Sequence, residues 1–156
     1  MNDRILVAYF TKGGASEEYS KIIADNLTDR GFSVHTINLA NEIPSVSNFD
    51  IIILGTGVRM FRVYRRWKKM LKQNELNNKK LFLFLSSGMA IEEPDKAVVK
   101  FLNPLVEKYD LKPKSMISFP GKIPEKWAKY EEKKETMKPE TAKEWAETIA
   151  HQIQDK

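Results

Sequence analysis

The stretch Arg-Ile-Leu-Val-Ala-Tyr-Phe-Thr-Lys-Gly-Gly-Ala-Ser, residues 4–16, carries the main information on the fold. Residues 5–10 are continuously apolar, whereas a strand with one solvated face alternates apolar and polar residues. The run therefore predicts a strand buried on both faces, in a parallel sheet with helices on both sides. Residues 13–16 then predict a glycine turn and a helix, with Ser16 as its N-cap and Gly31 at its end.

Apolar patterns in the rest of the chain continue an alternation of strands and helices. Strands are expected at residues 32–38, 50–55, 80–86 and 114–119, and helices at residues 63–71, 94–106 and 145–153. The dipeptide Asn103-Pro104 is expected to kink the middle one of these helices, because proline lacks a backbone N–H donor. The polar stretch 120–138 is expected to be a loop with a short helix around Trp127.

This alternation predicts both a fold and the position of its ligand site. It favours a three-layer α/β/α sandwich around a right-handed, doubly wound, five-stranded parallel sheet in the order 2-1-3-4-5. In that order the ligand crevice lies at the carboxyl ends of the first and third strands. A length of 156 residues without a repeat or linker predicts one domain over residues 1–156.

Composition excludes several kinds of chemistry. The chain has no cysteine, so disulfides, cysteine-ligated clusters and thiol nucleophiles are ruled out, and any redox chemistry needs a bound cofactor. Its two histidines, His35 and His151, lie far apart in sequence and predict no metal site. The apolar runs are strand-sized and no secretory signal is visible, so we expect a cytoplasmic protein without a transmembrane segment.

The loop after the first strand is the first candidate site. Two glycines let backbone N–H groups turn toward an anion at a helix N-terminus, and hydroxyls stand at both ends of the loop. The pattern predicts a phosphate cradle made of Thr11, Lys12, Gly13, Gly14, Ala15 and Ser16. The alternative is an ordinary glycine turn in which Ser16 only caps the helix.

This loop resembles the flavodoxin phosphate loop, usually Ser/Thr-x-Thr-Gly-x-Thr-Glu. The resemblance implies FMN as the cofactor, with its phosphate bound by Thr11, Gly14 and Ser16. Gly13 stands where the family usually has a threonine, so one hydroxyl donor is missing, and the charge of Lys12 could partly replace it. The resemblance covers about residues 4–153.

Two further loops are expected to border the flavin ring. The segment Gly55–Arg62 is similar to the Gly-x-x-Val-Arg-Tyr segment of the menaquinone-dependent protoporphyrinogen oxidases, and it offers the candidates Thr56, Gly57, Val58, Arg59, Met60 and Phe61. In the alternative, Phe61 packs in the core and Arg59 is a solvated charge. The loop after the fourth strand offers Ser87, Gly88 and Met89, or else is an ordinary strand-to-helix connection.

The resemblance implies an FMN-binding protein in electron transfer or in the two-electron reduction of a small acceptor such as a quinone. Both an FMN-dependent oxidoreductase and an electron carrier fit it. The motifs of Rossmann dinucleotide-binding domains, P-loop nucleotidases, receiver domains and serine hydrolases are missing. The alternative that stays open is a noncatalytic binding module that kept the fold and lost the flavin.

A basic segment, Arg59–Lys72, predicts an anionic neighbour. A solvated helix face is the usual explanation of such a segment, but its seven positive charges lie without an acidic residue among them and repel one another. An acidic redox protein, an acidic membrane surface and nucleic acid are all open as partners, with nucleic acid the least favoured. Because electron-carrier flavodoxins are typically acidic, this surface favours different partners or a reductase role.

Overall fold

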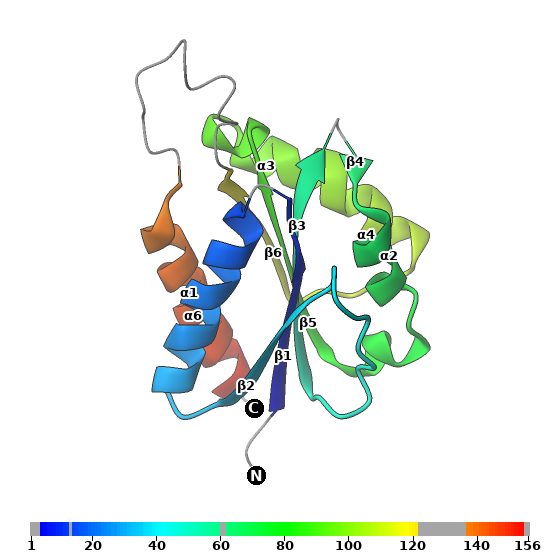
Figure 1. The fold of residues 1–156 in the computed structure, drawn as a ribbon, viewed down its shortest axis with the longest axis vertical. Coiled ribbons are helices and arrows are strands. Elements are labelled where there is room, and N and C mark those ends of the chain that lie inside the picture. The colour runs from blue at the N-terminus through cyan, green and yellow to red at the C-terminus, as the bar shows by residue number, and fades with distance from the viewer. Residues whose placement is uncertain (1–3, 13, 60–61, 122–136, 155–156) are drawn as a thin grey trace.

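The computed structural model describes residues 4–12, 14–59, 62–121 and 137–154. Its main sheet is parallel and runs in the order β2-β1-β3-β5-β6 (Figure 1), which is the predicted order 2-1-3-4-5 of the parallel strands. The strands are β1 (Arg4–Phe10), β2 (Ser33–Asn38), β3 (Ile51–Arg59), β5 (Lys80–Ser87) and β6 (Ser115–Pro120). The predicted fold class is therefore confirmed.

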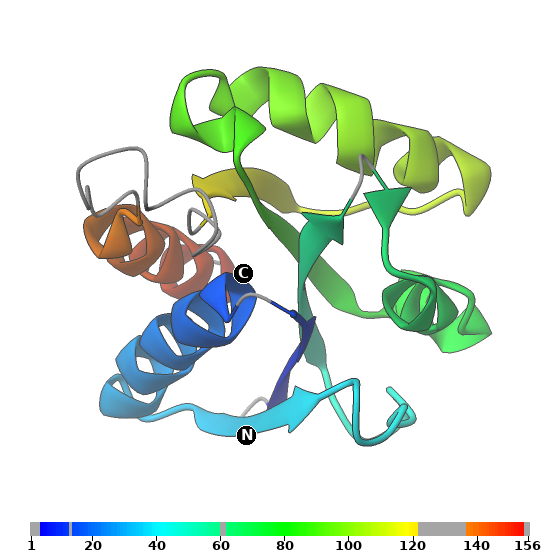
Figure 2. The same cartoon turned by 45° about the horizontal axis from the view of Figure 1, so that its top comes forward.

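Helices cover both faces of the sheet (Figure 2). On one face lie α1 (Ala15–Asp29) and α6 (Pro139–Gln154) side by side. On the other lie α2 (Arg65–Leu71), α3 (Pro94–Ala97) and α4 (Asn103–Lys108), with the 3-10 turns η1 (Asn74–Asn78) and η2 (Met89–Ile91). The break expected at Asn103-Pro104 takes the form of a π-helical turn, η3 (Val98–Leu102), because Pro104 cannot donate a hydrogen bond to the preceding turn.

Each face of the sheet has its own apolar core. In β1, Ile5 and Val7 pack with α1 and α6, whereas Leu6 and Ala8 pack with α2 and the helical segments 94–108. All four side chains are fully buried, which explains the continuous apolar run in the sequence.

The third strand is longer than predicted. β3 continues through Gly55 and Gly57 to Arg59, where the short strand β4 (Arg62–Val63) pairs with it antiparallel. The sequence predicts a loop from Gly55 onward. Gly55 instead makes room within the sheet, because a side-chain carbon on it would lie 1.9 Å from the ring of Phe84.

The start of α1 differs from the prediction. Ser16 is not the N-cap of α1: Gly14, with φ of 90°, occupies that position and Ser16 lies inside the helix. The left-handed conformation requires a residue such as glycine there, so the turn begins the helix without a side-chain cap. The short helix expected around Trp127 falls outside the described residues.

Candidate functional site

A crevice of about 110 Å³ opens at the carboxyl ends of β1, β3 and β5, where the strand order predicts a ligand site. It combines the loop after β1, the end of β3, the start of α2 and the loop after β5. The residues that line this crevice are Thr11, Lys12, Ala15, Gly57, Val58, Tyr64, Ser86, Ser87, Gly88 and Gly121.

The loop after β1 forms the end of the crevice next to the start of α1. Gly14 N donates to Thr11 Oγ1 at 2.9 Å, so the hydroxyl is held at the start of α1 as an acceptor. No acceptor for the hydroxyl proton of Thr11 occurs among the described residues, which leaves it free to donate to a ligand. The first backbone N–H groups of this 15-residue helix also lack an intrahelical acceptor. Together with the helix dipole they favour a bound anion.

Ser16 lies beneath the crevice rather than on its surface. Its side chain is fully buried and its Oγ lies 2.7 Å from Oγ of Ser86, in a hydrogen bond between α1 and β5. A side-chain carbon added at Gly57 would lie 3.9 Å from each of these hydroxyl oxygens. The serine pair therefore supports the crevice floor, and the phosphate contact expected of the Ser16 side chain stays a prediction.

An aromatic side chain forms the wall next to α2. Tyr64 is the N-cap residue of α2, and its ring centroid lies 4.6 Å from that of Phe10. Lys12 Nζ lies 6.0 Å from the centroid of the same tyrosine ring. A flat ring and a cation thus stand beside the glycine backbone of residue 57.

Another part of the lining consists of backbone segments held close together. Gly121 N donates to Ser87 O at 2.9 Å, and Ala90 N donates to Ser87 Oγ at 3.3 Å. A side-chain carbon on Gly121 would lie 3.3 Å from the backbone carbon of Ser87, so glycine permits this approach. Backbone of residues 87, 88 and 121 therefore forms this part of the lining, and Gly88 is the exposed residue among them.

The comparisons with known proteins match this architecture. A family model described as flavodoxin domain matches residues 6–152. The chain belongs to the flavodoxin domain family. A search of curated proteins finds no matching relative.

Solved structures share the fold of this flavodoxin domain. Flavodoxin 1 from Bacillus cereus has a TM-score of 0.68 and 15% identity, over 95% of this chain and 97% of that one. A Fusobacterium nucleatum flavodoxin mutant bound to flavin mononucleotide has a TM-score of 0.55 and 20% identity, over 76% of this chain and 70% of that one.

A longer protein contains the same fold. The rubredoxin:oxygen oxidoreductase of Desulfovibrio gigas has a TM-score of 0.64 and 16% identity, over 96% of this chain. The flavodoxin domain spans only 36% of that enzyme. The matches support FMN as the cofactor and give no support to the narrower resemblance to protoporphyrinogen oxidases.

Some of the predicted site residues of the flavodoxin domain line the crevice and others do not. Thr11, Lys12, Ala15, Gly57, Val58, Ser87 and Gly88 line the crevice, whereas Gly14 holds the turn. Thr56 is buried and its hydroxyl donates to Gly57 O at 2.8 Å. Met89 lines a separate pocket beside α3. Arg59 ends β3, with its side chain outside the described part, and Gly13, Met60 and Phe61 are also outside it.

Sequence reasoning missed three residues that line the crevice of the flavodoxin domain: Tyr64, Ser86 and Gly121. Tyr64 follows the second glycine loop as an aromatic residue at the start of a helix, and this position was a usable signal. The sequence places Ser86 at the end of a strand, and this position does not by itself indicate that the side chain lines a crevice. The approach of Gly121 depends on the pairing of β5 with β6, which no local pattern reveals.

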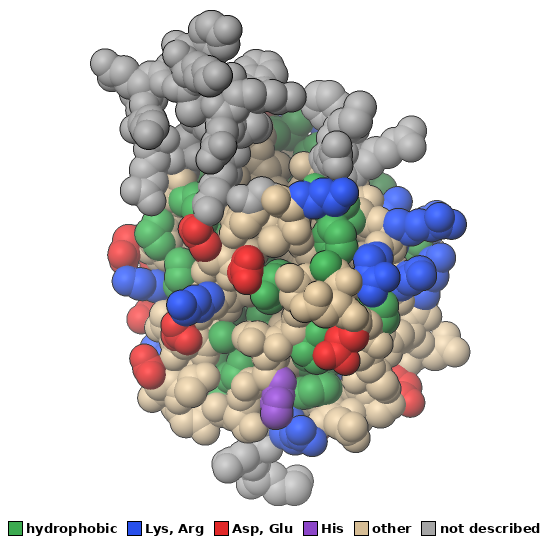
Figure 3. Space-filling view, in the orientation of Figure 1, with side chains coloured by type: hydrophobic (Ala, Val, Ile, Leu, Met, Phe, Trp, Pro, Cys, Tyr) green, Lys and Arg blue, Asp and Glu red, His purple; other side chains and the backbone are tan. Residues whose placement is uncertain are grey.

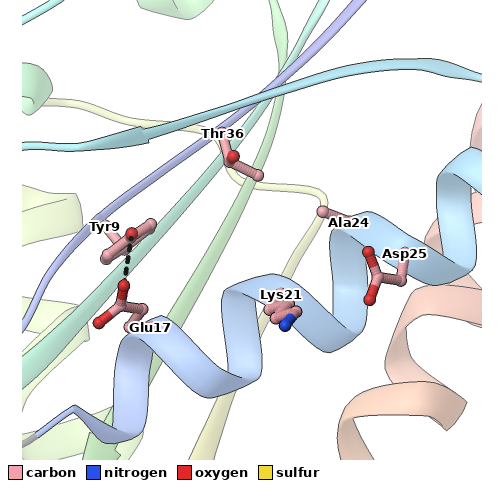
Figure 4. A pocket seen from close by; sticks show the side chains of 6 residues that line it. All are labelled: Tyr9, Glu17, Lys21, Ala24, Asp25 and Thr36. Carbon is pink, nitrogen blue, oxygen red and sulfur yellow. Dashed lines mark hydrogen bonds between the residues drawn. The ribbon is translucent and has the colours of Figure 1, made fainter.

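A larger pocket, of about 350 Å³, lies between α1 and the edge of the sheet of the flavodoxin domain (Figure 4). Tyr9 donates from its hydroxyl to Glu17 Oε1 at 3.3 Å. Burial raises the pKa of Tyr9, and the charge of Glu17 raises it further. Lys21 stands between Glu17 and Asp25 in the figure, so the charges lining this pocket are of both signs and favour no ligand class.

Two further findings bear on the flavodoxin domain. Within residues 4–12, 14–59, 62–121 and 137–154, no group of three or more aspartates, glutamates or histidines is placed to hold a metal ion. In the same part of the chain, none of the helices has the length and apolar character needed to cross a membrane.

Proposed function

We propose that this flavodoxin domain binds FMN in the crevice and uses it in electron transfer or in a two-electron reduction. The observation that carries the proposal is the joining, in one crevice, of a helix N-terminus that favours an anion, a tyrosine side chain, and the backbone of Ser87, Gly88 and Gly121. FMN offers a phosphate, a flat ring and polar ring edges, so the donor set fits each of its parts. When bound, FMN supplies the one- and two-electron redox chemistry that this cysteine-free chain lacks.

The phosphate is proposed to lie at the start of α1. There Thr11 has a hydroxyl proton to donate, and the backbone N–H groups of Ala15 and Ser16 lack helical acceptors. Lys12 is exposed at the same mouth and adds a positive charge. No adenylate-binding motif is visible in the sequence, which favours FMN over FAD.

The flavin ring is proposed to lie between Tyr64 and the backbone of residues 87, 88 and 121. Tyr64 supplies an apolar face, while the exposed backbone of Gly88 is the group that can contact a polar ring edge. Residues 56–61 keep their proposed role in bordering the ring, with Gly57 and Val58 lining the crevice. The chain's part in the reaction is thus to position the ring and set its electrostatics.

Flavin binding is the direct test. Protein mixed with excess FMN should quench the flavin fluorescence and shift its absorbance, and should bind FAD more weakly. Thr11→Ala should weaken FMN binding by about 0.5 to 1.5 kcal/mol, about two- to tenfold, since one hydrogen bond is lost. Thr28→Ala, at an exposed threonine far along α1, is the matched control and should bind FMN normally. If neither quenching nor a spectral shift occurs, the noncatalytic binding module is the better interpretation.

We further propose that the domain favours two-electron chemistry with a quinone-like acceptor. The support is the positive charge of Arg59 at the end of β3, next to the lining residue Val58. A unit charge about 6 Å from the ring, at an effective dielectric constant near 20, is worth about 3 kcal/mol before solvent screening. Such a charge favours the gain of negative charge on the ring.

Potentiometric titration of the FMN complex tests this second proposal. Arg59→Ala should lower the potential of the second electron, and Arg30→Ala, which removes the same charge at the far end of α1, should leave it unchanged. Equal potentials in Arg59→Ala and the unaltered protein would favour a one-electron carrier instead.

A further inference from the structure

The positive charge of the molecule is concentrated in one segment. Residues 51–74 contain seven lysines and arginines and no aspartate or glutamate. The whole chain has a net charge of +5, so subtracting these seven charges leaves −2 for all the other residues. The basic character therefore belongs to this segment and not to the chain in general.

Helix α2 presents these charges on a fixed surface. Trp67, Met70 and Leu71 are buried in the core beneath α2, which holds the helix against the sheet. The opposite side of the helix, here called the basic α2 face, consists of Arg65, Arg66, Lys68, Lys69 and Lys72. In Figure 3, lysine and arginine side chains gather on the side of the molecule where Figure 1 shows α2.

Within the described part of the chain, the basic α2 face has no acidic partner. Among the residues that the structure describes, no carboxylate forms an ion pair with any of its five side chains, although Lys96 and Lys143 elsewhere each pair with a glutamate. Arg66 donates from Nε to Leu39 O at 2.5 Å, which holds the guanidinium in place without neutralising it. Like charges crowded without counter-charges repel one another, and an anionic partner relieves this repulsion.

The basic α2 face also begins at the cofactor crevice. Tyr64 is both the N-cap residue of α2 and a wall of the crevice, and Lys12 lies beside its ring. A protein seated on α2 would therefore stand next to the proposed flavin.

We propose that the basic α2 face is the docking surface for an acidic electron-transfer protein. This proposal deepens the proposed function and rests on it for the electron exchange. Each electron gained by the flavin is lost by the redox centre of the docked protein, and no atom group is transferred. Charge complementarity steers such partners into register and raises their association rate.

The fold argues against the two other anionic partners. Helices that bind membranes place an exposed apolar face in the lipid, whereas the apolar side of α2 is buried in the protein core. The seven residues of α2 span only about 10 Å, which gives a short contact along a nucleic-acid backbone. A compact patch beside a redox site suits a small acidic protein.

A pair of matched charge reversals tests the proposal. Lys69→Glu/Lys72→Glu alters two exposed lysines of the basic α2 face. Lys112→Glu/Lys114→Glu makes the same change in net charge at two exposed lysines just before β6, near the amino ends of the strands and thus away from the crevice. The probe is an acidic [2Fe–2S] ferredoxin, with its affinity measured by calorimetry at two salt concentrations. Vesicles with phosphatidylserine and a single-stranded 20-nucleotide DNA are the competing probes.

The expected result is ferredoxin binding that weakens at least about tenfold in Lys69→Glu/Lys72→Glu and less than about threefold in Lys112→Glu/Lys114→Glu. No binding, an equal loss in both variants, or tighter binding to the vesicles or the DNA would overturn the proposal. Flavin quenching is measured on the same samples and should be the same in all three proteins. Ferredoxin binding without flavin binding would refute the proposed function while leaving the docking surface intact.

Discussion

Two buried serines one turn apart on α1 differ in what their hydroxyl groups do. Ser16 and Ser20 are both fully buried. Ser16 shares a hydrogen bond with Ser86, whereas Oγ of Ser20 has no hydrogen-bond partner among the described residues. A buried hydroxyl without a partner has given up its hydrogen bonds to water and forms no hydrogen bond within the protein to replace them. The two serines therefore make opposite contributions to the stability of the fold.

The first stability prediction compares these serines. Ser20→Ala should raise the free energy of unfolding by about 1 kcal/mol, because it removes an unsatisfied polar group and favours the helix. Ser16→Ala should lower the free energy of unfolding by about 1 to 3 kcal/mol, since Ser86 then keeps a buried hydroxyl without its partner. Chemical denaturation of both variants measures the two effects. A loss of stability in Ser20→Ala would mean that its hydroxyl has a partner in solution.

The same residues indicate what a sequence can reveal. The serine, the glycines and the threonine of residues 11–16 located the candidate site, because strand order brings this loop to the crevice whatever its details. The sequence could not tell whether the hydroxyl of Ser16 faces a ligand or the core. That depends on Ser86, 70 residues away, whose approach follows from the packing of α1 on β5. Likewise Met89 follows the third loop in sequence but lines another pocket, because η2 turns it toward α3.

At the level of elements, Tyr19 joins three of them through one hydroxyl group. From within α1 it donates to Pro120 O at the end of β6, at 2.5 Å, and accepts from Lys138 N just before α6, at 3.1 Å. Its ring stacks on Phe119, with centroids 4.6 Å apart. The order of strands and helices was predictable from apolar periodicity, whereas this junction was not, since a buried tyrosine at helical spacing resembles any core residue.

The junction leads to a prediction about stability and pH. Burial raises the pKa of Tyr19 above 10.0, Glu18 raises it further, and the hydrogen bond from Lys138 opposes these effects. The folded state thus holds the Tyr19 proton more tightly than the unfolded state. The contribution of this proton to the free energy of unfolding is complete below about pH 10 and is lost as the pH rises through the folded pKa. Tyr19→Phe should lower the free energy of unfolding by about 1 to 3 kcal/mol at pH 7 and reduce its decline above about pH 10.

Denaturation at several pH values measures both effects. Part of the decline should persist in Tyr19→Phe, because the pKa of Tyr9 is raised as well. Tyr109→Phe, at a half-buried tyrosine after α4, is the control and should keep the full decline. An unchanged decline in Tyr19→Phe would show that the hydroxyl proton is not bound more tightly in the folded state.

On the scale of the whole molecule, the positive charge lies on one side, although both faces of the sheet are covered in a similar way. Both sheet faces carry helices and an apolar core, yet the surplus of positive charge lies in residues 51–74, on one side. Composition gave the net charge but could not give this placement, because the sum of charges is independent of the fold. The consequence is a patch of like charges next to the crevice, and their mutual repulsion should destabilise the fold.

That repulsion should be visible as a dependence of stability on salt. The Debye length falls from about 30 Å at 0.01 M to about 10 Å at 0.1 M salt, so added NaCl screens the lysines and arginines of the basic α2 face from one another. Between about 10 and 300 mM NaCl, the melting temperature of the unaltered protein should rise by about 1 to 4 °C, the shift expected for several tenths to 1 kcal/mol in a domain of this size.

Lys69→Glu/Lys72→Glu should lose most of this rise, because two of the five crowded charges change sign. Lys112→Glu/Lys114→Glu has the same net charge and should keep the rise, since its basic α2 face is intact. Thermal melts of the three proteins at both salt concentrations therefore separate local crowding from net charge, and equal salt responses in the two variants would assign the effect to net charge alone.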